Sequence, residues 1–341
     1  MINREIYKQI KYNFDHIAKP IDSLGYFEEI FCKIGAVQGK VIPDISKRAV
    51  VIMCADNGII EEGVSQSGNE VTFLVAENMG KQASTVGLFA SKAGVGTIPV
   101  DIGMASENTP EGVINRKISR GTRNFAKEPA MDEASLNKAI EVGREMARLC
   151  RDNGMTILAT GEMGIGNTTT SAAVVASILK LDAESVVGRG AGLDSDGLAR
   201  KVQVVADAIK RYDCYNLDAK EILKCVGGYD IAGLTGLYLE CAGLGIPVVV
   251  DGVISATAAL AACEMDDKVK DILIASHCGK EPAISAIFDK LELRAVIDAD
   301  LALGEGTGAV MLFPLLDMVH ELYVQGSTFK DLSMDDYIRL Q

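Results

Sequence analysis

Short runs of β-branched and aliphatic residues alternate with helical stretches through most of the chain, and this alternation limits the fold more than any other feature. The runs are apolar and too short for helices, as expected of strands buried on both faces. They cover 49–56, 97–103, 156–160, 247–251 and 272–276. Helical periodicity is found at 70–80, 84–93, 132–152, 168–179, 196–211, 230–243, 253–263 and 281–290. We therefore predict an α/β fold, a three-layer parallel sheet of Rossmann-like type.

Both ends of the chain are expected to be helical. Apolar residues recur at helical spacing on either side of Pro20, and a further amphipathic run covers 308–324. Ser23 is a candidate N-cap for the second helix, and Gly35 is a candidate for its end. We predict a small helical domain made of 1–39 together with 306–341, beside a large α/β domain that covers 40–305.

The charge balance excludes several kinds of partner. Lys and Arg number 34 and Asp and Glu number 47, so the formal net charge is −13. Such an acidic chain lacks the basic face that binds nucleic acid or anionic lipid. The first residues lack the apolar core of a signal peptide, and no charge-free stretch is long and apolar enough to span a membrane. We expect a soluble, cytoplasmic protein with no nucleic-acid partner and no membrane span.

The eight cysteines and three histidines show no metal-binding spacing. There is no Cys-x-x-Cys and no His-Glu-x-x-His. Most of the cysteines lie in apolar runs, where we expect small buried side chains in a reducing compartment. We predict no metal site and no bound cofactor.

Glycine-rich or polar clusters follow the predicted strands directly. The first three strands are followed by ADNG, DIGM and GEMGIGN, and the last two by DGV and SHCGKE. In an open parallel sheet, ligands bind in the crevice outside the carboxyl ends of the strands. We expect these loops to converge on one ligand site.

The segment 156–170 reads as a strand, a glycine loop and a helix. Gly161 and Gly166 have the spacing of a phosphate-binding P-loop, but Asn167 stands where that motif needs lysine. Without the cation a triphosphate is disfavoured, whereas loop amides and the hydroxyl of Thr168 can hold a phosphate monoester or a ribose. An ordinary strand-to-helix turn with a threonine cap is the alternative.

A second glycine cluster, VVGRGAGL, covers 186–193 and includes Gly190. No strand clearly precedes it, so it is not a dinucleotide-binding fingerprint. Lys201, on the helix that follows, is a reasonable phosphate partner. Residue chemistry alone favours a solvated helical lysine instead.

Glu305 stands between Gly304 and Gly306 in the segment LALGEGTGAV. The glycines leave the backbone open to a ligand, which suits a general base. The helix that follows would lower the pKa of Glu305, and burial under an apolar ligand would raise it. An exposed glutamate in a turn is the alternative. Glu162 is a second carboxylate of the same kind, and the absence of a nucleophile elbow disfavours a covalent hydrolase.

Taken together, these segments resemble the nicotinate-nucleotide–dimethylbenzimidazole phosphoribosyltransferases, the enzymes that activate the lower ligand of cobalamin. The matching segments follow one another in order along nearly the whole chain. They are 19–29, 50–72, 100–104, 118–131, 161–169, 186–193, 226–234, 247–263, 276–277 and 303–309.

The resemblance implies that a benzimidazole nitrogen attacks the anomeric carbon of nicotinate mononucleotide, releasing nicotinate and forming α-ribazole phosphate. Glu305 matches the catalytic glutamate of the family, which takes the proton from the base. The family also implies a homodimer that needs no metal. The substrate-binding residues that the resemblance implies are Ser67, Val75, Glu162, Met163, Gly164, Gly166, Asn167, Thr168, Gly190, Lys201 and Leu303.

Four positions depart from the family pattern. Asn57 replaces a histidine, Gly68 replaces a proline, Val75 aligns with a glutamine and Met163 aligns with a leucine. These departures predict a more apolar base pocket and an altered base range that includes simple benzimidazoles, purines or phenols. The alternatives are a nucleotide-hydrolysing enzyme and a subunit of a heteromeric transferase.

Overall fold

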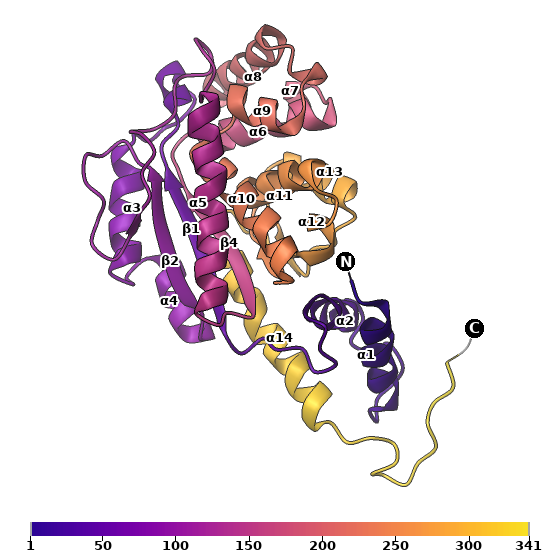
Figure 1. The fold of residues 1–341 in the computed structure, drawn as a ribbon. Helices are drawn as coiled ribbons and strands as arrows, with labels where there is room; N and C mark the ends of the chain where they lie inside the picture. The colour runs from indigo at the N-terminus through magenta and orange to yellow at the C-terminus, as the bar shows by residue number, and fades with distance from the viewer. Residues whose placement is uncertain (1, 340–341) are drawn as a thin grey trace.

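A six-stranded parallel sheet forms the centre of the chain in the computed structural model, which describes residues 2–339 (Figure 1). The strand order is β3-β2-β1-β4-β5-β6, and every neighbouring pair is parallel. The strands are β1 (Arg48–Ala55), β2 (Gly96–Gly103), β3 (Ile114–Asn115), β4 (Ile157–Met163), β5 (Val248–Val250) and β6 (Leu273–Ala275). This confirms the predicted α/β fold.

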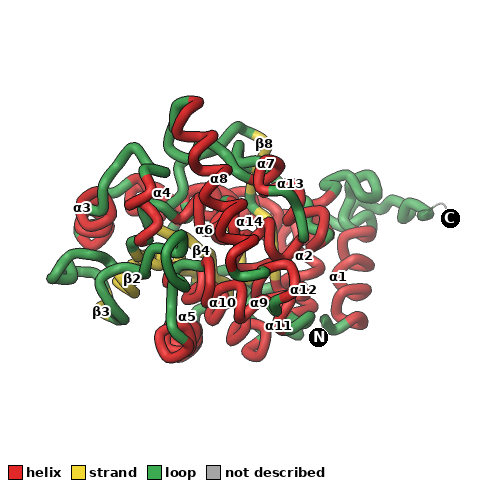
Figure 2. The backbone as a smooth tube through the Cα atoms, turned by 90° about the horizontal axis from the view of Figure 1, so that it is seen from above, coloured by secondary structure: helices red, strands yellow, loops and turns green. Residues whose placement is uncertain are grey.

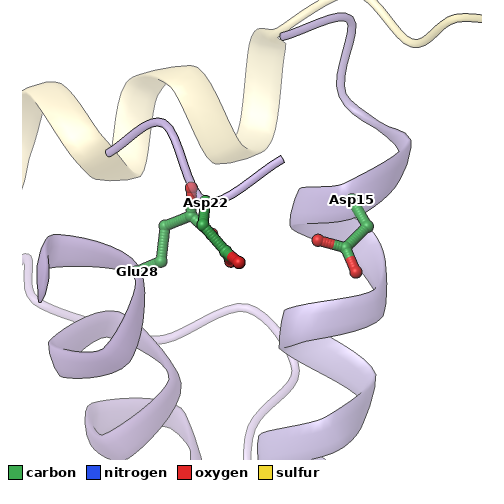
Figure 3. Close-up of side chains that lie close together, drawn as sticks. All are labelled: Asp15, Asp22 and Glu28. Carbon is green, nitrogen blue, oxygen red and sulfur yellow. The ribbon is translucent and has the colours of Figure 1, made fainter. Parts of the chain in front are cut away.

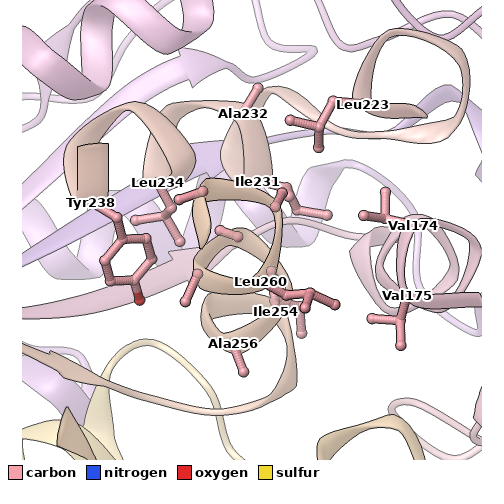
Figure 4. Close-up of a cluster of buried hydrophobic side chains, with 14 of the residues drawn as sticks. Val174, Val175, Leu223, Ile231, Ala232, Leu234, Tyr238, Ile254, Ala256 and Leu260 are labelled. Carbon is pink, nitrogen blue, oxygen red and sulfur yellow. The ribbon is translucent and has the colours of Figure 1, made fainter. Parts of the chain in front are cut away.

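The α-helices from α5 to α13 contribute to the larger hydrophobic core, on one face of the sheet. They are α5 (Glu133–Asp152), α6 (Asn167–Leu179), α7 (Ala183–Val186), α8 (Ser195–Arg211), α9 (Ala219–Val226), α10 (Tyr229–Leu244), α11 (Val253–Met265), α12 (Val269–Ile272) and α13 (Ala283–Leu291). Figure 4 shows where α6, α9, α10 and α11 meet within this core. The Tyr238 hydroxyl in this core has a partner in the sheet, because it lies 2.8 Å from Thr160 Oγ1.

The opposite face of the sheet is covered by α2 (Tyr26–Gln38), α3 (Glu70–Gly80), α4 (Thr85–Ala93) and α14 (Thr307–Gln325). Strand β1 shows why both faces need a cover. Val51 and Met53 contribute to one core, and Val50 and Ile52 contribute to the other. Strand β1 is apolar on both faces, without alternating polar residues, because it lies in the centre of the sheet, as the sequence predicts.

The remaining elements are α1 (Arg4–His16), the short helices η1 (Gly58–Glu62) and η2 (Cys214–Asn216), and the strand pair β7 (His277–Cys278) and β8 (Ile297–Asp298). Helix α1 packs with α2 and the C-terminal half of α14 around a small core that includes Phe14, Phe31 and Val319. Figure 2 shows α1 at one end of the molecule and α3 at the other. The proposed division into 1–39 plus 306–341 and 40–305 stays a prediction, and the N-terminal half of α14 packs on the sheet.

Two predicted helix boundaries are wrong. Helix α2 is preceded by Gly25, not capped by Ser23, and it continues through Gly35 to end at Gly39, which has a φ of +67°. Gly35 is needed for packing, because a Cβ at this position would lie 2.3 Å from Ile10 Cδ1 on α1. A glycine that allows two helices to approach closely resembles a helix end when only the sequence is read.

Helix α14 is long and apolar enough to cross a membrane by length and composition. No other helix within residues 2–339 passes this test. Leu312, Phe313 and Leu316 of α14 are fully buried against the sheet, as expected of a core helix of a folded domain. All eight cysteines are free, and seven are buried, which agrees with their predicted role.

Candidate active site

A cavity of about 680 Å³ opens at the carboxyl ends of β4 and β5. Three of the five loops expected to converge contribute to its walls, those after β4, β5 and β6, together with the glycine cluster 187–193 and the turn 301–305. The segments ADNG (55–58) and DIGM (101–104), which follow β1 and β2, are not part of the lining, so the predicted convergence is observed only for the loops on the β4–β6 side of the sheet. The lining consists of 64–66, 162–168, 187–193, 252–254, 279–282 and 301–305, with Leu198 and His277.

Glu305 reaches this cavity from a left-handed turn. Gly304, Glu305 and Gly306 have φ angles of +86°, +63° and +87°. A positive φ is unfavourable for a residue with a Cβ, so the fold must hold Glu305 in place. Its carboxylate is partly buried, and Oε2 accepts a 3.4 Å hydrogen bond from the Val86 amide on α4. Burial raises the pKa of Glu305, which answers the question that the sequence left open.

Asp251 holds the turn of Glu305 in place through hydrogen bonds to backbone amides. This buried carboxylate follows β5 and accepts hydrogen bonds from the amides of Gly306 (3.2 Å) and Ala309 (3.0 Å), at the start of α14. It therefore satisfies helix N-terminal donors for which α14 has no capping side chain of its own. Burial raises the pKa of Asp251. Sequence reasoning missed this residue, although its place directly after an apolar strand was a usable signal.

Glu162 ends β4 beside the same turn. A Cβ on Gly304 would lie 2.8 Å from Glu162 Oε1, so only glycine permits this approach. The Asn167 amide nitrogen donates to Glu162 Oε2 and, at 3.0 Å, to Asp230 Oδ2. Burial, followed by the charge of Asp230, raises the pKa of Glu162 to about 8. Burial also raises the pKa of Asp230, to about 6. Because the pair is buried and is bridged by a neutral amide, which opposes the rise in pKa only in part, it retains a proton at neutral pH.

This proton gives the fold a testable pH dependence. The pKa of Glu162 rises from 4.5 to about 8 on folding, so its stabilising contribution is full below pH 4.5 and is lost as the pH rises toward 8. Between pH 6.5 and 8, above the pKa of Asp230, the carboxyl of Glu162 should contribute a fall in the free energy of unfolding of about 1 kcal/mol per pH unit, measured as the difference in slope from a variant without that carboxyl, because Lys201 titrates in the same range with the opposite sign. Glu162→Gln should remove most of this slope in urea unfolding. An equal slope in both proteins would contradict the assignment.

Lys201 lies behind Thr168 and Gly188, which line the cavity, and is fully buried. Its Nζ donates to Thr168 Oγ1 (2.8 Å) and to the Gly188 carbonyl (3.0 Å). No carboxylate within residues 2–339 forms an ion pair with this ammonium at 4 Å or less. Burial lowers the pKa of Lys201 to about 8. The prediction from residue chemistry that Lys201 is a solvent-exposed lysine on a helix is therefore wrong.

The structure brings most of the predicted site residues together. Those that line the cavity are Glu162, Met163, Gly164, Gly166, Asn167, Thr168, Gly190, Leu303 and Glu305. Lys201 lies directly behind Thr168. Ser67 and Val75 are not part of the lining: Ser67 closes a turn with Ser65, and Val75 packs against the core below α3. Their roles stay predictions.

The cavity also includes residues that sequence reasoning did not propose. Gln66 donates to the Gly192 carbonyl across the cavity mouth, and Glu281 accepts a hydrogen bond from the Gly190 amide. His277 Nδ1 lies 2.9 Å from Ser276 Oγ. The segment SHCGKE, which contains His277 and Glu281, directly follows a predicted strand. Its position therefore indicated a ligand site, but the sequence did not indicate which of its side chains reach the cavity.

A separate group of carboxylates, Asp15, Asp22 and Glu28, has oxygen atoms within 4.8 Å of one another in the N-terminal helical unit (Figure 3). These acids already have counter-ions. The cations paired with them are Lys11, Lys19 and Arg339. An ion-paired group of this kind gives no support to a metal site.

Comparison with known proteins agrees with this geometry. A phosphoribosyltransferase family model matches residues 1–333. The chain is 40% identical over 337 residues to a protein of Acetivibrio thermocellus named nicotinate-nucleotide–dimethylbenzimidazole phosphoribosyltransferase, covering 98% of this chain and 96% of that protein. A Thermus thermophilus protein of the same name is 40% identical over 313 residues, covering 92% of this chain and 93% of that protein. The crystal structure of CobT from Thermus thermophilus superposes with a TM-score of 0.93 at 38% identity, covering 98% of this chain and all of that one.

Proposed function

Because this chain belongs to the nicotinate-nucleotide–dimethylbenzimidazole phosphoribosyltransferase family, we propose that it moves the phosphoribosyl group of nicotinate mononucleotide to the nitrogen of a lower-ligand base. The observation that carries this proposal is one cavity that brings together two different groups. Glu305, a carboxylate on a strained turn, lines the cavity, and Lys201, a buried ammonium with no paired carboxylate among residues 2–339, lies behind Thr168 in its wall.

Glu305 acts as the general base. The unprotonated nitrogen of the azole forms a bond to the anomeric carbon, while the bond to the pyridinium nitrogen breaks and its electron pair stays on nicotinate. The departing pyridinium is already cationic, so it needs no acid. The N–H proton of the attacking azole passes to Glu305, which prevents a cationic product. Two planar bases held on either side of one ribose supply the remaining rate enhancement through orientation.

The phosphate is held beside Gly190. Three donors are grouped at this residue: Thr168 Oγ1 and Lys201 Nζ, which a Cβ on Gly190 would approach to 2.9 and 3.5 Å, and the amide of Gly190 itself. A buried cation paired only with neutral oxygens is stabilised when an anion arrives. This set of donors, which we call the phosphate cradle, binds the mononucleotide against the repulsion of a net charge of −13.

The resemblance to the family implies a base pocket more apolar than usual, and Met163, which lines the cavity, supports this. Val75 packs against the same core cluster as Met163 but does not line the cavity. We expect the protein to accept simple benzimidazoles, purines or phenols as well as dimethylbenzimidazole. The test supplies nicotinate mononucleotide with an equimolar mixture of bases and identifies the products by mass spectrometry. Several ribosylated products are expected, and strict use of dimethylbenzimidazole would reject the broadened range.

The protein acts as a homodimer. Exposed apolar side chains lie on α4 and α14, which pack against each other, and they include Leu88, Phe89 and Met318. Leu303, at the cavity, is also 53% exposed. A second copy of the chain would cover such a face. Leu88→Asp combined with Met318→Asp should give a monomer in analytical ultracentrifugation, whereas Leu149→Asp on α5 should not. A monomeric unmodified protein would contradict the proposal.

The protein works in the cytoplasm. Its cysteines are free thiols, and burial raises the pKa of several of them, as for Cys150 and Cys263 (to about 12), which keeps them protonated and unreactive. Cell fractionation should place the protein in the soluble fraction. Its recovery with membranes would contradict this location.

A further inference from the structure

A carboxylate already occupies one donor of the phosphate cradle. Glu281 lies in the segment before α13, and its Oε1 accepts a 3.0 Å hydrogen bond from the Gly190 amide. The other oxygen lies against the neighbouring backbone, since a Cβ on Gly188 would be 2.1 Å from Glu281 Oε2. The carboxylate of Glu281 therefore fills the concave backbone of 188–190, where an anionic ligand would be expected.

The ammonium on the other side of Gly190 is left without this anion. Lys201 contacts two neutral oxygens, those of Thr168 and Gly188. Glu281 is close enough for its charge to act on the pKa of Lys201, yet the two side chains form no ion pair at 4 Å or less. Gly190 adjoins both groups: its amide donates to the carboxylate, and a Cβ on it would lie 3.5 Å from the ammonium. The carboxylate of Glu281 therefore provides an acceptor for the Gly190 amide of the cradle but does not pair with the ammonium of Lys201.

We propose that Glu281 is an internal competitor of the substrate phosphate for the Gly190 amide and moves away when that phosphate binds. This inference rests on the proposed function. A dianionic phosphate and a carboxylate cannot share one N–H donor, and like charges at this distance repel. The apparent affinity of any phosphate-bearing ligand is reduced by the fraction of molecules in which Glu281 has moved away.

Competition of this kind has a consequence for turnover. The product of the reaction keeps the phosphate, so a carboxylate that returns to the Gly190 amide helps to expel the product. The same competition applies to free inorganic phosphate, which has no base or ribose with which to gain further contacts. Glu281 therefore lowers the affinity of the cradle for small anions and for the mononucleotide by the same factor.

The test compares Glu281→Gln and Glu281→Ala with the unmodified protein in phosphate-free buffer. Inorganic phosphate binding is measured by calorimetry, and the KM for nicotinate mononucleotide is measured at saturating dimethylbenzimidazole. Both constants should fall by a similar factor, about tenfold for Glu281→Gln, because both ligands face the same competitor. Glu281→Ala should give at least as large a fall. Glu107→Gln, which changes the net charge equally at an exposed site, should change neither constant.

Two results would overturn the inference. A higher KM in Glu281→Gln would mean that the carboxylate binds the substrate directly, for instance at the ribose hydroxyls. An unchanged or weaker affinity for inorganic phosphate would mean that Glu281 does not compete. Calorimetry with inorganic phosphate does not depend on catalysis, so it decides the role of Glu281 even if the unmodified protein transfers no phosphoribosyl group.

Discussion

Glu305→Gln is expected to lower kcat by a factor of about 10²–10⁴, the usual range for loss of a general base. Affinity for nicotinate mononucleotide should change little, because Glu305 makes none of the contacts of the phosphate cradle. Glutamine keeps the shape of the side chain and can still accept the hydrogen bond from Val86, so the left-handed turn should persist. Steady-state kinetics with dimethylbenzimidazole and calorimetry with the mononucleotide measure the two effects separately.

Glu305→Asp is the matched variant for this experiment. It keeps the charge and withdraws the carboxylate by one methylene group, and aspartate tolerates a positive φ better than most residues. Its kcat should lie between those of the unmodified protein and Glu305→Gln. Near-normal turnover in Glu305→Gln would exclude a general-base role for this residue.

Lys201→Met is expected to raise the KM for nicotinate mononucleotide by about 100-fold, which corresponds to loss of one buried charged contact to phosphate. Thermal stability should stay equal or increase. Folding places this ammonium in the interior, where burial lowers its pKa to about 8 and no ion pair compensates the lost solvation. Methionine is similar in length and carries no charge, so it fills the same space without that cost.

Lys210→Met, at an exposed position on the same helix, serves as the control. It should leave both the KM and the melting temperature unchanged. If Lys201→Met were strongly destabilised while its KM stayed normal, Lys201 would be a structural residue, and the phosphate would have to bind elsewhere.

The sheet could be predicted because the local sequence of its central strands is enough to identify them. An apolar run such as β1 has to be buried on both faces, and polar loops after such strands have to meet at one edge. Gly35 shows the limit of this reasoning: the glycine was assigned to a helix end because its partner, Ile10, is visible only when two helices pack.

The electrostatics of the site could not be predicted, because they depend on contacts between distant segments. The pKa of Glu305 is set by burial beside Val86, which lies 219 positions away in the sequence. The burial of Lys201 depends on its packing behind Thr168, and Asp251 acts only because α14 begins above β5. Residue type and spacing identify these groups, but the fold determines which of them are buried.

Release of nicotinate from nicotinate mononucleotide, measured with and without dimethylbenzimidazole, tests the central claim most directly. We expect release only when the base is present, with one molecule of ribosylated base formed for each nicotinate, and almost none with Glu305→Gln. Equal release without the base would identify a hydrolase, and no release under either condition would contradict the proposed reaction.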